Sequence, residues 1–260
     1  NAYMNRGQVH SDRGSAGRAI ADYDRAIELM DELDAQWPLA YRTDLAGAYT
    51  NRGNAYFEAG AVDLAITDSS RAIELLTASR ATGGNQQIDQ DNLLAGTLSN
   101  RAGQHTRMAN FAAAVVDATH AIEIRERSRK QLGTRWPEDH KSHLGDAYLE
   151  RGKALLKSGK PADALCDLNR SIALKESLRR GDLTQWDPYH RTGLAESYAT
   201  RADLHREIGD SPLARSDYDQ AIALITGLRN QTGTLWPADY RRTAASAYSG
   251  RAALARGLGD

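Results

Sequence analysis

Small and apolar residues recur along the chain with the period of an α-helix. In the segment 19–27, Ala19, Tyr23 and Ala26 stand at positions i, i+4 and i+7, each with polar neighbours. The segments 65–73 and 214–222 repeat this arrangement. Such spacing places the apolar side chains on one face of a helix. The frequent alanines on that face favour helices that pack closely against one another.

A second pattern divides the chain into repeats. The segment 49–56 reads YTNRGNAY, and related segments occur throughout the chain, each centred on an arginine: Arg6, Arg52, Arg101, Arg151, Arg201 and Arg251. Successive arginines are 46, 49, 50, 50 and 50 residues apart. Eight residues after each arginine stands a turn-forming or small residue: Gly14, Gly60, Ala109, Gly159, Gly209 and Gly259. Each repeat is therefore predicted to form two antiparallel helices joined by a short turn.

These residues resemble the tetratricopeptide repeat family. Tyr49, Gly53, Tyr56, Ala65 and Ala72 stand where that family has its aromatic, small, aromatic, alanine and alanine positions. The resemblance implies an all-α, right-handed superhelical solenoid of antiparallel helix hairpins, with about 11 helices in this chain. Two features depart from the family: an arginine replaces the leucine before the glycine, and the period is about 50 rather than about 34 residues. The longer period predicts helices of about 20 residues.

The repeats predict one continuous domain over residues 1–260. Its units are expected at 1–36, 37–85, 86–135, 136–185 and 186–235, followed by a sixth first helix at 236–260. The chain opens inside a repeat and closes at a turn. We therefore expect it to be a segment of a longer, bacterial-style multidomain protein.

An aspartate follows each of the first five arginines at a distance of sixteen residues. The pairs are Arg6 with Asp22, Arg52 with Asp68, Arg101 with Asp117, Arg151 with Asp167, and Arg201 with Asp217. The turn lies midway between the partners, so both stand at the same height in an antiparallel hairpin. We predict a structural ion pair within each hairpin. An anion-binding row of arginines is the alternative interpretation.

Tryptophan and proline mark the expected start of several first helices, because proline suits a first helical turn and tryptophan can pack on the next turn. The phrases begin at Trp37, Trp136, Trp186 and Trp236, whereas the joint at 82–87 lacks one. A basic residue follows in each phrase, giving the row Arg42, Lys141, Arg191 and Arg241. This row is a weaker candidate for a phosphate site. Asp139, His140 and His143 are a still weaker candidate for a metal site, since tyrosines replace His140 in sister repeats.

The family resemblance implies that first helices line a concave groove. On the helix around Arg52, the face opposite the packed one then carries Thr50, Asn54 and Phe57, with Asn51 at its edge. The predicted ligand-binding residues on first helices are Asn5, Gln8, Asn51, Asn54, Phe57, Asn100, Arg107, Glu150, Lys153, Lys157, Asp203 and Arg206. Their mixed amides and charges suit hydrogen bonds to a peptide. Family members that bind a terminal carboxylate need basic residues after two asparagines, but Asp146 and Glu150 follow Asn54 and Asn100. That carboxylate clamp is therefore not expected.

Charge and cysteine content narrow the classes of function. The net charge is −1 and the isoelectric point about 6.7, so no global field attracts nucleic acid or a membrane. Cys166 is the single cysteine, which excludes an internal disulfide and favours a reducing, cytoplasmic location. Because Cys166 follows Ala164 and Leu165, we expect it to be buried. No apolar run reaches the roughly 18 residues of a membrane span.

These observations favour a protein- or peptide-binding scaffold. We find no phosphate-cradling glycine loop, nucleophile elbow or metal-spaced histidine helix, so neither an enzyme nor a cofactor is expected. Two alternatives stay open: a solenoid that binds nucleic acid or a phosphate ligand, and a structural module that self-associates through its ends.

Overall fold

The computed structural model describes residues 2–36, 41–80, 87–179, 186–232 and 238–258. These residues form eleven α-helices and one short 3-10 helix, and no strand occurs among them. The predicted all-α class and helix number are thus confirmed. Helices α2 to α11 contain 16 to 22 residues, close to the predicted length, whereas α1 has 11.

The chain divides into two compact units, which are described separately. Unit 1 covers Asn1–Arg135 and unit 2 covers Trp136–Asp260, so the division coincides with a predicted repeat boundary. Unit 1 contains α1 (Ala2–Asp12), α2 (Ala16–Gln36), α3 (Arg42–Glu58), α4 (Val62–Arg80), α5 (Gln87–Arg107), α6 (Phe111–Leu132) and η1 (Gly133–Arg135). Unit 2 contains α7 (Glu138–Lys157), α8 (Pro161–Glu176), α9 (Pro188–Glu207), α10 (Ser211–Thr232) and α11 (Ala238–Leu258).

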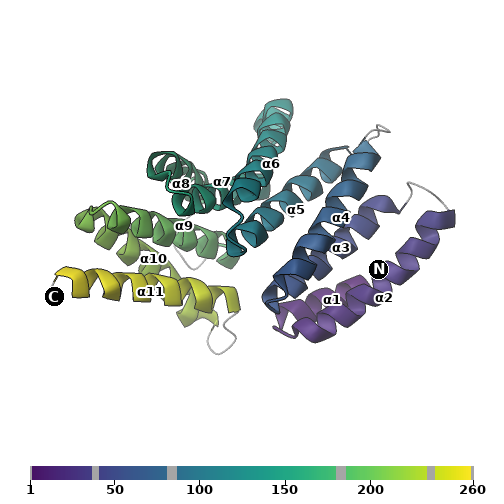
Figure 1. Cartoon of the computed structure of the whole chain (residues 1–260), viewed down its shortest axis with the longest axis horizontal. Helices are drawn as coiled ribbons and strands as arrows, with labels where there is room; N and C mark the ends of the chain where they lie inside the picture. The colour runs from purple at the N-terminus through teal and green to yellow at the C-terminus, as the bar shows by residue number, and fades with distance from the viewer. Residues whose placement is uncertain (1, 37–40, 81–86, 180–185, 233–237, 259–260) are drawn as a thin grey trace. The chain divides into compact units, whose positions relative to one another are not determined.

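Within each unit, consecutive helices form antiparallel hairpins (Figure 1). Unit 1 has three hairpins: α1–α2, α3–α4 and α5–α6. Unit 2 has the hairpins α7–α8 and α9–α10, and α11 packs against both α9 and α10. The odd-numbered helices are the first helices of the repeats and each carries one of the six arginines. The even-numbered helices are the second helices.

The turn of each hairpin needs a left-handed backbone residue. Gly60 has a φ of 83°, and the N–H of the following Ala61 donates to the carbonyl of Tyr56 at 2.9 Å. This contact satisfies one of the carbonyls left free at the end of α3. Glycine adopts positive φ without a steric penalty. Ala109 occupies the same position with a φ of 58° and is the one non-glycine residue with positive φ in the described part of the chain.

Small residues bring the two helices of a hairpin close together. A Cβ atom added to Gly53 on α3 would meet the Ala65 carbonyl oxygen on α4 at 3.2 Å. One added to Gly152 on α7 would meet the Leu168 side chain on α8 at 3.1 Å. Fully buried alanines, including Ala65, extend this contact along each hairpin. The alanine-rich apolar face predicted from the sequence therefore forms the core of each unit.

The tryptophan-proline joints mark helix starts where the structure describes them. Trp136 and Trp186 are buried, and α7 and α9 begin at Glu138 and Pro188, in each case two residues further on. Pro188 lies in the first helical turn, where its missing N–H leaves no unsatisfied donor. The phrases at residues 37–38 and 236–237 and most of the joint at 82–87 lie outside the described residues.

Cys166 is exposed, so the prediction that it is buried is wrong. The buried positions of α8 are Ala164, Asp167, Leu168 and Ser171, which repeat at helical spacing. Cys166 lies two residues after Ala164 and therefore points away from that face. In the described segments, no helix is long and apolar enough to cross a bilayer.

Candidate functional site

Each predicted arginine–aspartate pair forms a bidentate ion pair between the two helices of its own hairpin. Arginine Nε donates to aspartate Oδ2 at 2.6 to 2.8 Å, and Nη2 donates to Oδ1. The five pairs are Arg6–Asp22, Arg52–Asp68, Arg101–Asp117, Arg151–Asp167 and Arg201–Asp217. The aspartates are buried at the hairpin interface. The contact is the fork-to-fork geometry that favours arginine over lysine.

Within each unit, a third guanidinium donor, Nη1, links a first helix to the second helix of the preceding hairpin. Arg52 Nη1 donates to Asp24 on α2 at 2.7 Å, and Arg201 Nη1 donates to Asn169 on α8 at 2.7 Å. The same donor of Arg101 meets Ser70 on α4, and that of Arg251 meets Asp219 on α10. These partners stand eighteen residues after the preceding arginine. A polar residue at this regular interval of eighteen is the sequence signal from which the links between hairpins could have been predicted.

Aromatic rings also contact several of the arginines, and the paired carboxylate affects the pKa of Arg52. The guanidinium of Arg52 lies over the Tyr49 ring, with its central carbon 5.2 Å from the ring centroid. Arg201 and Tyr198 repeat this contact at 5.5 Å. The hydrogen bond to Asp68 raises the pKa of Arg52 above its ordinary value, against the opposing effect of burial. The charged guanidinium of Arg52 therefore links the two helices of its hairpin through Asp68.

In unit 1, predicted ligand-binding residues on neighbouring first helices meet each other. Asn100 Nδ2 on α5 donates to Asn54 Oδ1 on α3 at 2.9 Å in an exposed contact. The guanidinium of Arg107 lies over the Phe57 ring, 5.2 Å from its centroid. An amide pair and a cation–π pair thus cross from α3 to α5.

The other predicted residues of unit 1 do not take part in these two contacts. Gln8 donates to Asp12 within α1 at 2.8 Å. Asn5 is exposed and Asn51 is half-buried.

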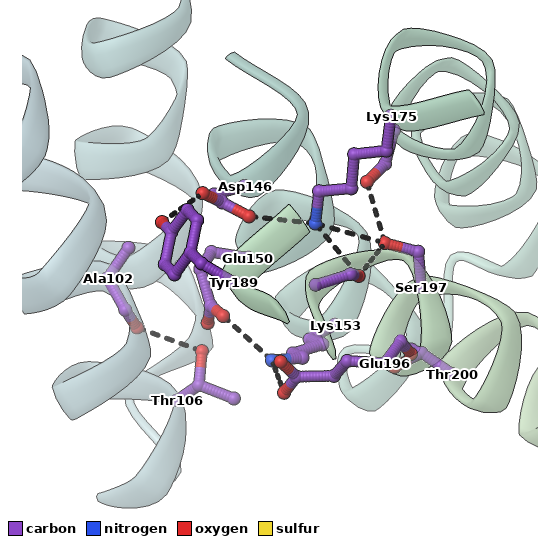
Figure 2. A network of polar contacts seen from close by, with 12 residues as sticks. Ala102, Thr106, Asp146, Glu150, Lys153, Lys175, Tyr189, Glu196, Ser197 and Thr200 are labelled. Atoms are coloured by element: carbon purple, nitrogen blue, oxygen red, sulfur yellow. Dashed lines mark hydrogen bonds and ion pairs between the residues drawn. The ribbon is translucent and has the colours of Figure 1, made fainter. Parts of the chain in front are cut away.

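In unit 2, Lys153 joins two first helices through two carboxylates. Its Nζ on α7 lies 2.7 Å from Glu150 on the same helix and 2.7 Å from Glu196 on α9 (Figure 2). Burial lowers the pKa of Lys153, but the two glutamates outweigh this effect and the net shift is upward. The pKa of Glu196 is lowered because the attraction of Lys153 overcomes the effect of burial. Lys153 and Glu196 are therefore both charged at neutral pH.

A buried lysine lies beside this contact. Lys175 on α8 is fully buried, and its Nζ lies 2.7 Å from Asp146 on α7. It also donates to the Gly193 carbonyl at 3.0 Å and to Ser197 Oγ at 3.2 Å, both on α9. The Tyr189 hydroxyl donates to the second oxygen of Asp146 at 2.8 Å (Figure 2). Burial would raise the pKa of Asp146, but Lys175 and Tyr189 lower it overall.

The remaining predicted residues of unit 2 lie at the turn ends of α7 and α9. Arg206 Nη2 lies 3.3 Å from Asp203 on its own helix, and the Tyr218 hydroxyl of α10 also donates to Asp203. Lys157 on α7 is 3.9 Å from Glu207 on α9 and stays largely exposed. Sequence reasoning missed Asp146, Lys175 and Glu196 as members of this network. Lysine at the buried position 175 was the available signal, because it must find a carboxylate.

At two other candidate positions, Thr50 and Arg191, the side chain is buried and cannot contact a ligand. Thr50, predicted on the ligand-facing side, is buried between α3 and α5, where its hydroxyl lies 2.9 Å from that of Thr97. Arg191 of the basic row is fully buried and donates to the Leu224 carbonyl at 3.1 Å. Arg42 lies 3.6 Å from Asp34, while Arg241 is exposed. The predicted phosphate row therefore lacks one of its members.

The suggested metal ligands also remain without support. Asp139 lies 3.6 Å from His190 rather than in a ligand cluster. Across the described ranges, no group of three or more histidine, cysteine, aspartate or glutamate side chains is placed to hold a metal ion.

We refer to Asn54 and Asn100 as the first-helix polar face of unit 1, and to Glu150, Lys153 and Glu196 as the first-helix polar face of unit 2. Each of these residues either contacts a neighbouring first helix or contacts a residue that makes such a contact, and each side chain is at least partly exposed. Because their side chains are already held in place, little conformational entropy is lost when a ligand contacts them. The arrangement provides amides and charges for hydrogen bonding, with no nucleophile–base pair among these five residues.

Comparisons with known proteins identify the repeat and the fold. A family model described as "Tetratricopeptide repeat" matches residues 1–29. No curated protein matches the chain. The spacing of about 50 residues therefore rests on the sequence pattern alone.

Several solved structures share the fold at low sequence identity. BtubC (BKLC) from P. vanneervenii has a TM-score of 0.66 and 16% identity, over 95% of this chain and 85% of that one. The apo form of RapI has a TM-score of 0.65 and 11% identity, over 96% and 82%. The TPR-like repeats of a putative kinesin light chain from Podosopora anserina reach 0.57 and 12%, over 88% and 95%. Residues 1–29 thus carry a tetratricopeptide repeat, and the chain has the fold of a tetratricopeptide-like helical repeat protein.

Proposed function

We propose that the chain is a protein- or peptide-binding scaffold and that a ligand binds the first-helix polar face of a unit. A fold of this type generally mediates protein–protein interaction. The observation that carries the proposal is the polar contact between neighbouring first helices in each unit: the exposed pair Asn54 with Asn100, and the part-buried pair Lys153 with Glu196. These contacts fix donors and acceptors on adjacent helices at the surface, as recognition of a backbone and its side chains requires.

The two units offer different chemistry to a ligand. Unit 1 presents a neutral amide pair beside the Phe57–Arg107 stack. In unit 2, Lys153 lies between Glu150 and Glu196, so the group carries one net negative charge. We therefore expect unit 1 to accept backbone amides and an apolar or acidic side chain. Unit 2 should favour a basic side chain.

A displayed random-peptide library tests this proposal. Peptides selected on the intact chain should bind at least about tenfold more weakly to Asn54→Ala or Lys153→Ala, a loss of about 1.4 kcal/mol. Glu123→Ala on α6 is the matched control, because Glu123 is exposed on a second helix and belongs to neither contact. Isothermal titration calorimetry gives the affinities. Failure to enrich any peptide, or equal loss with the control variant, would contradict the proposal.

The nucleic-acid alternative has a separate test. Binding by a positive surface weakens steeply with salt, because bound counterions are released. The near-neutral chain and the internally paired arginines oppose such binding. We expect no salt-dependent retention of single- or double-stranded nucleic acid in a filter-binding titration.

The reducing compartment suggested by the single cysteine supports a cytoplasmic role.

A further inference from the structure

A histidine lies beside the arginine–aspartate pair in three of the five hairpins. It stands four residues after the repeat arginine, one helical turn further along the first helix, as His10, His105 and His205. Its Nε2 lies 3.8 to 3.9 Å from the Oδ2 atom of the paired aspartate. The equivalent positions in the other two hairpins hold Tyr56 and Leu155, which carry no positive charge. The repeat thus accepts an uncharged side chain at this position.

The hairpin α5–α6 shows why the charge state of this histidine matters. Asp117 Oδ2 already accepts a hydrogen bond from Arg101 Nε at 2.7 Å, and Oδ1 accepts one from Nη2 at 2.8 Å. The guanidinium therefore balances the charge of the carboxylate. The His105 side chain is 16% exposed, so most of it is shielded from water. A proton on His105 adds a second cation to a largely buried group that already has no net charge, which is unfavourable.

The charged groups that act on His105 come from two helices. Burial has the largest effect and lowers the pKa of His105 below its ordinary value of 6.5; Asp117 on α6 opposes this shift, and Arg101 on α5 itself adds to it. Helices α3 and α4 also pack on α5. Within the described segments of these two helices, no charged group acts on His105, and α4 contributes the neutral hydroxyl of Ser70, which accepts from Arg101.

We propose that His105 makes the hairpin α5–α6 sensitive to pH: the neutral imidazole packs beside the Arg101–Asp117 pair, and its protonation in mild acid loosens the contact between the two helices. In the opened hairpin, His105 returns to its ordinary pKa and binds the proton more readily than in the closed one. The stability of the hairpin is therefore greatest above pH 6.5 and falls as the pH drops through this value. This device does not depend on the ligand proposed for the first-helix polar faces.

Hydrogen–deuterium exchange of the α6 amides, followed by mass spectrometry, tests the proposal. After correction for the intrinsic exchange rate, the opening of α6 in the intact chain should increase at least about threefold from about pH 7.5 to about pH 5.5. Ordinary carboxylates keep their charge over this range, so the increase reports on histidine. His105→Leu, which introduces the side chain found at position 155, should reduce the increase to less than about 1.5-fold.

His120→Leu is the matched control, because His120 is an exposed histidine on α6 of the same hairpin. This variant should show the same increase as the intact chain. An equal increase in the intact chain and in His105→Leu, or no increase in the intact chain, would overturn the proposal.

An NMR titration of the His105 ring in the intact chain provides a second test that needs no substitution and holds even where His105→Leu does not fold. A titration midpoint below 6.5 supports the proposal. A midpoint at or above 6.5 would overturn it, because protonation would then not weaken the closed hairpin.

Discussion

The hairpins α3–α4 and α7–α8 follow the same repeat but fill one core position with opposite chemistry. Leu76 on α4 and Lys175 on α8 both stand 24 residues after the repeat arginine, and both are fully buried. In the second hairpin, the lysine meets Asp146, where the first has Gly47. The ion pair also reaches Gly193 and Ser197 on α9. The hairpin α7–α8 thus uses a directional polar network at a position where α3–α4 uses apolar packing.

This comparison distinguishes a contact that both hairpins share from a core position whose residue type can vary. The arginine–aspartate pair is present in both hairpins with the same geometry. The position of Leu76 and Lys175 accepts either an aliphatic chain or a compensated charge. A buried ion pair contributes little net stability over apolar packing, but removal of one partner is costly. The two hairpins should therefore respond differently to loss of a single carboxylate.

The largest expected effect is that of Asp146→Ala. This substitution leaves the fully buried Lys175 without its carboxylate, and it should lower the free energy of unfolding by about 3–4 kcal/mol. Urea unfolding followed by circular dichroism measures the loss. In a Lys175→Leu background, which installs the residue found at position 76, the same substitution should cost less than about 1 kcal/mol. Equal losses in the two backgrounds would show that Asp146 does not act through Lys175.

The next effect concerns the feature that both hairpins share. Asp68→Ala and Asp167→Ala each remove the bidentate carboxylate partner of a largely buried arginine at the hairpin interface, and each should cost about 3 kcal/mol. Asp63→Ala, at an exposed position in the first turn of α4, should cost less than about 0.5 kcal/mol. Thermal unfolding of the three variants makes the comparison. Similar melting temperatures for Asp68→Ala and Asp63→Ala would contradict the structural role of the pair.

Acid should weaken unit 2 through its ion-pair network. The folded-state pKa of Asp146 lies below its ordinary value of 3.8, and that of Glu196 lies below 4.5. A lowered carboxyl pKa contributes stability that is present above the unfolded-state value and is lost as the pH falls through the folded-state value. The stability of the chain should therefore fall below about pH 4. The variant Asp146→Ala/Lys175→Leu should show a shallower decline in urea titrations at successive pH values. An identical decline would exclude the contribution of this pair.

The smallest effect concerns the turns. Ala109 adopts the left-handed conformation that Gly60 adopts in the hairpin α3–α4. Ala109→Gly should relieve this strain and raise stability by about 1 kcal/mol, whereas Gly60→Ala should lower it by about the same amount. Differential scanning calorimetry measures both changes. A fall in melting temperature for Ala109→Gly would contradict the assignment of strain.

The sequence was sufficient to predict the hairpins and their internal pairs, because both depend on spacing along one helix and across one turn. The sixteen-residue interval between Arg52 and Asp68 encodes their contact directly. The link from Arg52 to Asp24 also has a regular interval, but it joins successive hairpins and becomes evident only when their stacking is known. Lys175 could not be paired from spacing alone, because its partner depends on which helix faces it. Thr50 was misplaced because neighbouring first helices cover part of the face assigned to a ligand.

The most direct test of the binding proposal is an amide chemical-shift map of the chain with a peptide selected from the library. We predict that the largest shifts fall on first helices, around Asn54 and Asn100 or around Lys153 and Glu196. Residues on second helices, such as Glu74 and Glu123, should remain unperturbed. Shifts confined to second helices, with both first-helix polar faces silent, would contradict the proposal.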